Sequence, residues 1–125
     1  MQENEISAII IDCALKIHKI LGPGLFENVY ETALEYELQN HGLYVQTQVP
    51  IPLVYEAIKL EAGYRVDILV ENKVIIEIKS IEAIAPVHRK QLLTYLRPSN
   101  KKLGLLINFN VEFLKDGIIR LVNNL

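Results

Sequence analysis

The sequence predicts an α/β protein in which a mixed central sheet is flanked by helices. Apolar residues recur at helical spacing over the first forty residues and again after Pro86. Stretches rich in Val, Ile, Tyr and Thr, which are typical of strands, lie between and after them. The resulting order is helix, helix, three strands, helix, two strands. The third helix must therefore cross between strands of one sheet.

Length and composition indicate a single folded domain over residues 1–125. Half of the residues are hydrophobic, and folding of such a chain buries roughly two-thirds of its unfolded surface. The one cysteine, Cys13, excludes a disulfide framework and a zinc site built from cysteines, and it fits a reducing cytoplasm. No apolar run approaches a bilayer span, and the acidic residues 1–5 do not resemble a secretory signal. We therefore expect a cytoplasmic protein that does not bind a membrane.

Three helices are expected: one that ends before Gly22, one at residues 25–40 and one at residues 86–96. Asn4 or Ser7 is the expected cap of the first helix, and Gly22-Pro23-Gly24 ends it. The second helix ends near Gly42, so that the first two form a helical hairpin. Pro86 suits the first turn of the third helix, and Pro98 closes it.

Five strands are expected, at residues 44–55, 64–70, 74–80, 103–109 and 118–122. Pro50 and Pro52 assign the first strand to an edge of the sheet, because proline cannot donate to a ladder. The run 103–109 is almost entirely apolar, as expected for a strand covered on both faces.

Three charged residues interrupt the apolar strands: Asp67, Glu77 and Lys79. Glu77 and Lys79 are two residues apart and share a face of their strand. A three-residue turn at 71–73 would bring Asp67 opposite Glu77, whereas a two-residue turn would bring it opposite Ile78 with its carboxylate on the other face. Only the first register assembles the three side chains.

Two neighbouring carboxylates repel each other unless one is protonated or a divalent cation binds. Oxygen ligands suit Mg²⁺ or Mn²⁺, and such an ion can activate water and neutralise charge on a phosphoryl oxygen. Lys79 would then position the water or stabilise the transition state. The alternative from spacing alone is an edge-strand ion pair of Glu77 with Lys79, with Asp67 facing solvent.

Charge is unevenly distributed along the chain. Residues 1–82 carry 13 acids and 6 bases, and residues 83–125 carry 2 acids and 7 bases. Arg89 and Lys90 belong to this basic part, which is either a solvated helix face or a phosphate-binding surface. On the same predicted helix, His88, Gln91 and Tyr95 follow one stripe, where an amide and a phenol can donate to phosphate or sugar oxygens. Tyr95 would otherwise be a half-buried core residue, and His88 a surface one.

Residues 24–30 read Gly24-Leu25-Phe26-Glu27-Asn28-Val29-Tyr30, in which a glycine, a glutamate and a tyrosine recur at intervals of three. This segment matches the pattern that names the GxxExxY family, and the sequence thereby resembles this family of the PD-(D/E)XK nuclease superfamily. The likeness continues, in the same order, through residues 64–67, 74–79, 86–96, 102–109 and 115–118. Val66 stands where the superfamily commonly has the proline that precedes its first acid.

The resemblance implies a restriction-endonuclease-like αβββαβ core and a phosphodiesterase site that uses Mg²⁺ or Mn²⁺. By position, Asp67 and Glu77 would be metal-binding acids, Lys79 the signature lysine, and Glu27 the helix acid that completes the metal site. The alternative for Glu27 is a simple charge that the helix dipole favours at a helix start. Gln91 and Tyr95 match the Gln-x-x-x-Tyr helix motif that faces nucleic acid in exonuclease-type members.

The expected function is therefore metal-dependent hydrolysis of DNA phosphodiesters. Gln91, Tyr95 and the basic stretch from Arg89 to Lys102 would hold the nucleic-acid backbone. A small acidic domain has little surface for gripping a duplex, which points to self-association or a protein partner. Two alternatives stay open: a non-catalytic nucleic-acid- or protein-binding module on the same fold, and an unrelated hydrolase of small phosphoesters.

Overall fold

The computed structural model describes residues 1–125, with the exception of the side chain of residue 62. The helices are α1 (Glu3–Leu21), α2 (Glu27–Asn40) and α3 (Pro86–Ser99), with a short 3-10 helix η1 (Leu114–Gly117). The strands are β1 (Val45–Tyr55), β2 (Ile58–Val70), β3 (Val74–Lys79), β4 (Leu103–Asn108) and β5 (Ile118–Val122). The predicted α/β class and the αβββαβ core, which here runs from α2 to β4, are confirmed.

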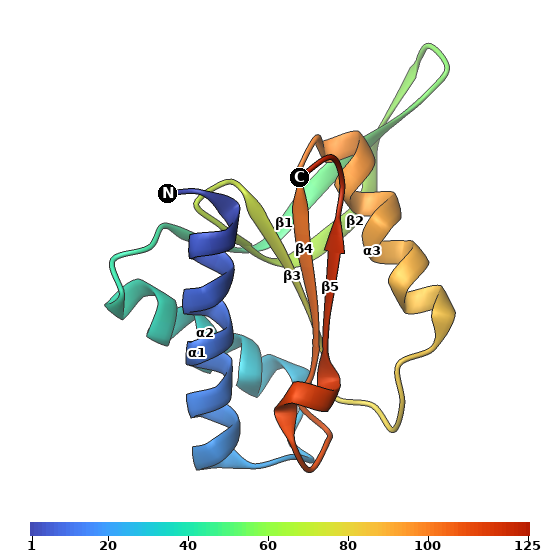
Figure 1. Ribbon diagram of the computed structural model, residues 1–125. Coiled ribbons are helices and arrows are strands. Elements are labelled where there is room, and N and C mark those ends of the chain that lie inside the picture. The colour runs from blue at the N-terminus through green and yellow to red at the C-terminus, as the bar shows by residue number, and fades with distance from the viewer.

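The five strands form one mixed sheet in the order β1-β2-β3-β4-β5. β3 and β4 are parallel and are joined through α3, whereas the other neighbouring pairs are antiparallel. Figure 1 shows α1 and α2 on one side of the sheet and α3 on the other. The strand with the two prolines, β1, lies at an edge, as predicted.

Each face of the sheet has its own apolar core. The larger core joins α1 and α2 to side chains of β2, β3 and β4 that point to that side, such as Ile68, Ile76 and Leu105. The smaller core joins α3, through Leu92 and Leu96, to the opposite side. Every residue of β4 is buried, which agrees with its apolar sequence.

The start of α1 differs from the prediction that Asn4 or Ser7 caps it. The helix begins at Glu3, and the backbone N–H of Gln2 donates to the Glu5 carboxylate (3.0 Å). Ser7 is buried inside the helix. Glu5 is the third residue of the helix, and its carboxylate bonds back to the residue before the helix. This bond lets the helix start before Asn4 and Ser7, although Asn and Ser are the residue types preferred as helix caps.

The other two helices also differ from prediction by a few residues. α2 begins at Glu27 rather than Leu25, because Phe26 before it is extended. α3 continues three residues beyond Leu96, with Pro98 inside its last turn. The carbonyls near this end keep their partners, since Ser99 Oγ donates to Tyr95 (2.6 Å) and Lys101 N–H to Leu96 (3.0 Å).

Strand β2 is longer than predicted, because it starts at Ile58 instead of Tyr64. Its first half pairs with the second half of β1 in a hairpin that projects beyond the rest of the sheet (Figure 1). This part of β2 is a strand because its backbone pairs with β1, not because its side chains are buried. Val54 and Ile58 are both exposed. In the described residues, no helix is both long and apolar enough to cross a membrane.

Candidate functional site

A three-residue turn at 71–73 sets the register between β2 and β3. Val70 pairs with Val74 and Ile68 with Ile76, which places Asp67 beside Glu77 at the end of the ladder. At this point, two backbone N–H groups donate to side-chain carboxylates instead of to backbone carbonyls. Asp67 N–H donates to Glu77 Oε1 (3.3 Å), and Ile78 N–H donates to Asp67 Oδ2 (2.7 Å). Of the two registers that the sequence left open, the structure has the one that brings the acids together.

The Glu77 carboxyl is buried between its neighbours, with 9% of the residue exposed. Burial raises its pKa to about 8, and both the charge of Asp67 and a hydrogen bond with the Asp67 carboxyl contribute to this rise. The Asp67 backbone N–H and the charge of Lys79 act in the opposite direction. Without a metal, the protonated form of Glu77 is therefore favoured at neutral pH, and a bound cation would favour the ionised form.

Lys79 lies on β3 two residues after Glu77 and is half-buried. Strand alternation gives the two side chains the same face. Its charge favours the ionised form of Glu77. The amine therefore lies on the face of β3 that carries Glu77 and interacts electrostatically with that acid.

Helix α2 supplies a third acid, Glu27, at its first residue. Glu27 Oε2 accepts a hydrogen bond from the backbone N–H of Ser80, directly after β3 (3.0 Å). Glu27 and Asp67 also line the same cavity of about 210 Å³. The structure thus brings the predicted helix acid to the end of the sheet where Asp67 lies.

The tyrosine of the Gly-x-x-Glu-x-x-Tyr segment fixes the turn that presents Glu27. Tyr30 is fully buried and stacks on Phe109, with ring centroids 4.3 Å apart. Its hydroxyl donates to the Gly22 carbonyl (2.6 Å) and accepts from Leu25 N–H (3.1 Å). Gly24 has a φ of 92°, which a residue with a side chain rarely adopts. The Gly-x-x-Glu-x-x-Tyr segment therefore has a structural role, because its tyrosine fixes the backbone conformation directly before α2.

Two polar residues at this cavity were not predicted from the sequence. Glu31 lies one turn after Glu27 on α2, a spacing that could have identified it. Burial raises its pKa, the hydrogen bond from Gln48 lowers it, and the charge of Asp67 raises it. Gln48 Nε2 donates to Glu31 Oε1 (2.7 Å) and lies 3.4 Å from Asp67 Oδ1.

Gln48 occupies an unusual backbone position in the edge strand. Its φ is 52°, in the left-handed region that costs a non-glycine residue about 1 kcal/mol or more. This conformation interrupts the pairing of β1 with β2 opposite Asp67. Nothing in a Thr-Gln-Val sequence signals such a position, so local sequence could not have revealed it.

Helix α3 places Tyr95 near the acids. Tyr95 stacks on Tyr64, with ring centroids 3.5 Å apart, and Tyr64 Oη donates to the Tyr95 carbonyl (3.0 Å). Burial raises the pKa of Tyr95, and the charges of Glu77 and Asp67 raise it further. Its phenol therefore stays protonated and can donate a hydrogen bond.

The remaining predicted residues of α3 lie farther toward solvent. Gln91 and Lys90 are exposed. His88 is engaged at the helix start, where its Nδ1 accepts from Ala85 N–H (2.9 Å). Arg89 lines a different cavity, of about 320 Å³, together with Glu82 and Asp116. The structure therefore brings Glu27 and Asp67 to one cavity and joins Asp67 to Glu77 by a hydrogen bond, whereas the basic residues do not line that cavity.

The chemistry of this donor set fits a hard divalent cation. Asp67, Glu77 and Glu27 offer carboxylate oxygens, which are the ligands preferred by Mg²⁺ and Mn²⁺. Without a cation, the buried carboxyl of Glu77 favours its protonated form, because burial and the charge of Asp67 raise its pKa. The alternative from the sequence was an ion pair of Glu77 with Lys79, with Asp67 facing solvent. It does not describe this arrangement, because the Asp67 carboxylate accepts from the backbone of β3 and the Glu77 carboxylate accepts from the backbone of β2.

Comparison with known proteins identifies the class. The sequence profile of the PD-(D/E)XK nuclease superfamily matches residues 4–121. The chain belongs to this superfamily, and its mixed α/β architecture is consistent with a restriction-endonuclease-like fold.

The solved structures add a relative of the fold. The chain described as "Crystal structure of SSO0001" is 23% identical, with a TM-score of 0.50, over 95% of this chain. The match covers 57% of that chain, so the present sequence spans little more than half its length. At this identity the likeness concerns the fold alone. No curated protein matches the sequence.

Proposed function

We propose that the chain is a divalent-metal-dependent nuclease that hydrolyses DNA phosphodiester bonds. The observation that carries the proposal is the pair of neighbouring acids Asp67 and Glu77, in which the Asp67 backbone N–H donates to the buried Glu77 carboxylate and the Asp67 carboxylate accepts from Ile78 N–H. The Gly24–Tyr30 segment supports membership of the GxxExxY family. We also propose that residues 1–125 form one domain and that the protein is cytoplasmic.

In this proposal, Asp67, Glu77 and Glu27 hold Mg²⁺ or Mn²⁺. When bound, such an ion lowers the pKa of a coordinated water and neutralises charge on a phosphoryl oxygen. Lys79, on the same face as Glu77, stabilises the charge that develops on the phosphate. Glu27 also accepts from Ser80 N–H, which ties α2 to the end of β3 and keeps the acids together.

The nucleic acid is proposed to lie along α3. The Tyr95 phenol and the Gln91 amide donate to backbone oxygens, and Arg89 and Lys90 attract phosphates. His88 contributes near the helix start, where its Nδ1 is already occupied. Because these groups cover one small face of an acidic chain, a second copy or a protein partner is proposed to complete the grip on a duplex.

The test is cleavage of labelled single- and double-stranded DNA by the full chain with Mg²⁺, Mn²⁺ or EDTA. We expect metal-dependent cleavage that falls at least about 100-fold in Glu77→Gln, because a neutral amide is a poor ligand for a hard cation. Glu112→Gln is the matched control, since Glu112 is an exposed acid outside the cavity that Glu27 and Asp67 line.

The outcomes separate the hypotheses. Unchanged cleavage by Glu77→Gln would show that the assigned acids are not the site. DNA binding by the parent chain without cleavage under any metal condition would favour the non-catalytic binding module on the same fold. Cleavage of small phosphodiesters alone would leave α3 without its proposed role.

A further inference from the structure

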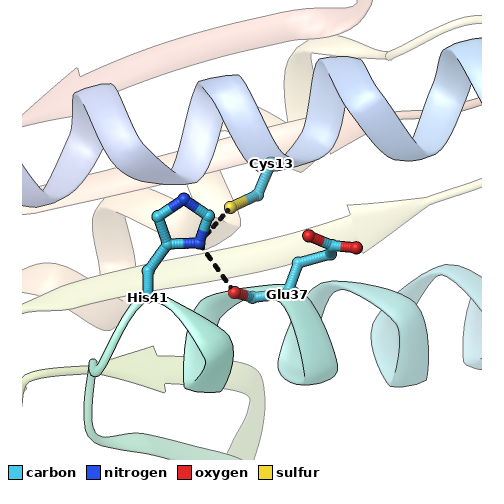
Figure 2. Close-up of side chains that lie close together, drawn as sticks. All are labelled: Cys13, Glu37 and His41. Atoms are coloured by element: carbon cyan, nitrogen blue, oxygen red, sulfur yellow. Dashed lines mark hydrogen bonds between the residues drawn. The ribbon is translucent and has the colours of Figure 1, made fainter.

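A second group of metal-ligating side chains lies between α1 and α2, formed by Cys13, Glu37 and His41 (Figure 2). One potential ligand atom of each residue lies within 4.8 Å of the other two. Cys13 comes from the middle of α1, Glu37 from the last turn of α2, and His41 directly follows that helix. None of the three lines the cavity that contains Glu27 and Asp67.

The separation of sulfur and nitrogen suits tetrahedral coordination. Cys13 Sγ lies 3.6 Å from His41 Nδ1. Zinc bonds of about 2.3 Å to sulfur and 2.0–2.1 Å to nitrogen, at a tetrahedral angle, place these two atoms about 3.5–3.6 Å apart. An ion could therefore bind both atoms with little movement of either helix.

The existing hydrogen bonds can be exchanged at low cost. His41 Nδ1–H donates to the Glu37 carbonyl (2.9 Å), and moving this proton to Nε2 makes Nδ1 available as a ligand. The carbonyl keeps a second donor, the backbone N–H of His41 (3.2 Å). The Glu37 carboxylate pairs with Lys16 (3.0 Å), whose side chain is exposed and can move away into solvent.

We propose that Cys13, His41 and Glu37 form a binding site for Zn²⁺ or a similar borderline transition-metal ion, with solvent as the fourth ligand. The thiolate and imidazole distinguish this site from the all-oxygen set of Asp67, Glu77 and Glu27, which suits Mg²⁺. On binding, the Cys13 thiol releases its proton to solvent as the sulfur–metal bond forms.

The local charges agree with a cation at this position. Burial raises the pKa of the Cys13 thiol, and the carboxylates of Glu37 and Asp12 raise it further, against a smaller opposing effect of Lys16. The same two carboxylates that disfavour a thiolate favour a dication beside it. His41 is exposed, so an ion in solution can reach this residue, which lies 3.6 Å from the buried sulfur.

The structural consequence is a link between α1 and the end of α2. Helix α2 carries Glu27 at its opposite end, so the ion would hold in place the helix that bears one of the candidate catalytic acids. Counting cysteines could not reveal such a site, because it uses one cysteine with two ligands of other types.

The test is titration of the full chain with Co²⁺, monitored through the near-ultraviolet charge-transfer band of a cobalt–thiolate bond. Cys13 is the one cysteine of the chain, so this band reports on the proposed site and not on the acids near β3. We expect a band that saturates at one ion per chain, disappears on addition of Zn²⁺, and is absent from Cys13→Ala.

Ligand variants complete the experiment. His41→Gln, at an exposed position, should weaken Co²⁺ binding at least about tenfold, and Glu37→Gln should do so to a lesser degree. Glu35→Gln on the same helix is the matched control and should bind as the parent does. Zn²⁺ should also raise the Tm of the parent chain but not that of His41→Gln.

Absence of the thiolate band in the folded parent chain would overturn the proposal. A band of equal strength in His41→Gln and the parent would also overturn it, because the thiol would then bind the ion without the site. Neither result would bear on metal-dependent DNA cleavage, which depends on different residues.

Discussion

At the scale of single residues, the acids of the candidate site are costly to the fold. The Glu77 carboxyl is buried beside Asp67, where an apolar side chain would pack at lower free energy. Gln48, opposite Asp67, has a positive φ. Such costs often collect at functional sites, because a ligand or a reacting group relieves them.

Glu77 predicts how the stability of the metal-free chain depends on pH. Its pKa is about 8 in the folded state, compared with an ordinary value of 4.5, so between these values the folded state binds more protons than the unfolded state. The free energy of unfolding should therefore fall as pH rises from 5 to 8. One titrating proton accounts for a decrease of at most about 1.4 kcal/mol for each pH unit. Urea unfolding in EDTA at several pH values measures this.

The matched variant for this prediction is Glu77→Gln, which keeps the shape and removes the titration. Its stability should change much less between pH 5 and 8, and at pH 8 it should exceed that of the parent. Mg²⁺ at pH 8 should stabilise the parent but not the variant. Parallel pH profiles for the two chains would contradict the assignment of the raised pKa to this residue.

At the scale of elements, the position of Glu27 depends on the start of α2. Tyr30 anchors the preceding turn through Gly22 and Leu25, and Ser80 Oγ donates to the Leu25 carbonyl (2.6 Å). The motif tyrosine therefore acts on the site indirectly, by fixing the backbone from which the acid projects.

Tyr30→Phe should lower the free energy of unfolding by about 1–3 kcal/mol. The ring still packs on Phe109, but the Gly22 carbonyl and the Leu25 N–H lose their partner. Tyr36→Phe is the matched control, because Tyr36 is exposed on the same helix. Chemical denaturation of both variants decides the question, and equal stabilities would show that the hydroxyl does not anchor the turn.

The element boundaries show where sequence patterns were sufficient. Strand β5 occupies the predicted residues 118–122, and β4 and β3 each end one residue before the predicted end. Apolar runs bounded by turn residues define these strands. The first half of β2 was missed because its apolar residues Ile58 and Leu60 are exposed, so that no burial pattern marks them as part of a strand.

At the scale of the whole molecule, the sheet separates two chemically different sides. The side of α1 and α2 carries Glu27, Glu31 and the Cys13 cluster, whereas α3 on the other side carries exposed Arg89 and Lys90 (Figure 1). A phosphate backbone would be attracted to the α3 side and repelled by much of the rest.

The double variant Arg89→Gln/Lys90→Gln should weaken DNA binding and reduce its salt dependence. Each lost phosphate contact lowers the slope of log K against log salt by roughly 0.9, so the slope should fall by about 1–2. Lys19→Gln/Lys115→Gln is the control, because it removes the same charge at two other exposed positions. Fluorescence anisotropy over a salt series, without divalent metal, measures the slopes; equal slopes for both variants would remove α3 from the interface.

The α/β class, the order of helices and strands, the edge position of β1 and the candidate acids Asp67, Glu77 and Glu27 were predictable from the sequence. These predictions use local information: apolar periodicity, proline positions, charged residues in apolar strands and the Gly24–Tyr30 motif. Three features required the folded structure: the alignment of Asp67 with Glu77 by the 71–73 turn, the cavity that Gln48 and Glu31 share, and the contact of Cys13 with His41. These contacts join residues far apart in the chain, and their geometry depends on strand register and helix packing, which local patterns leave open.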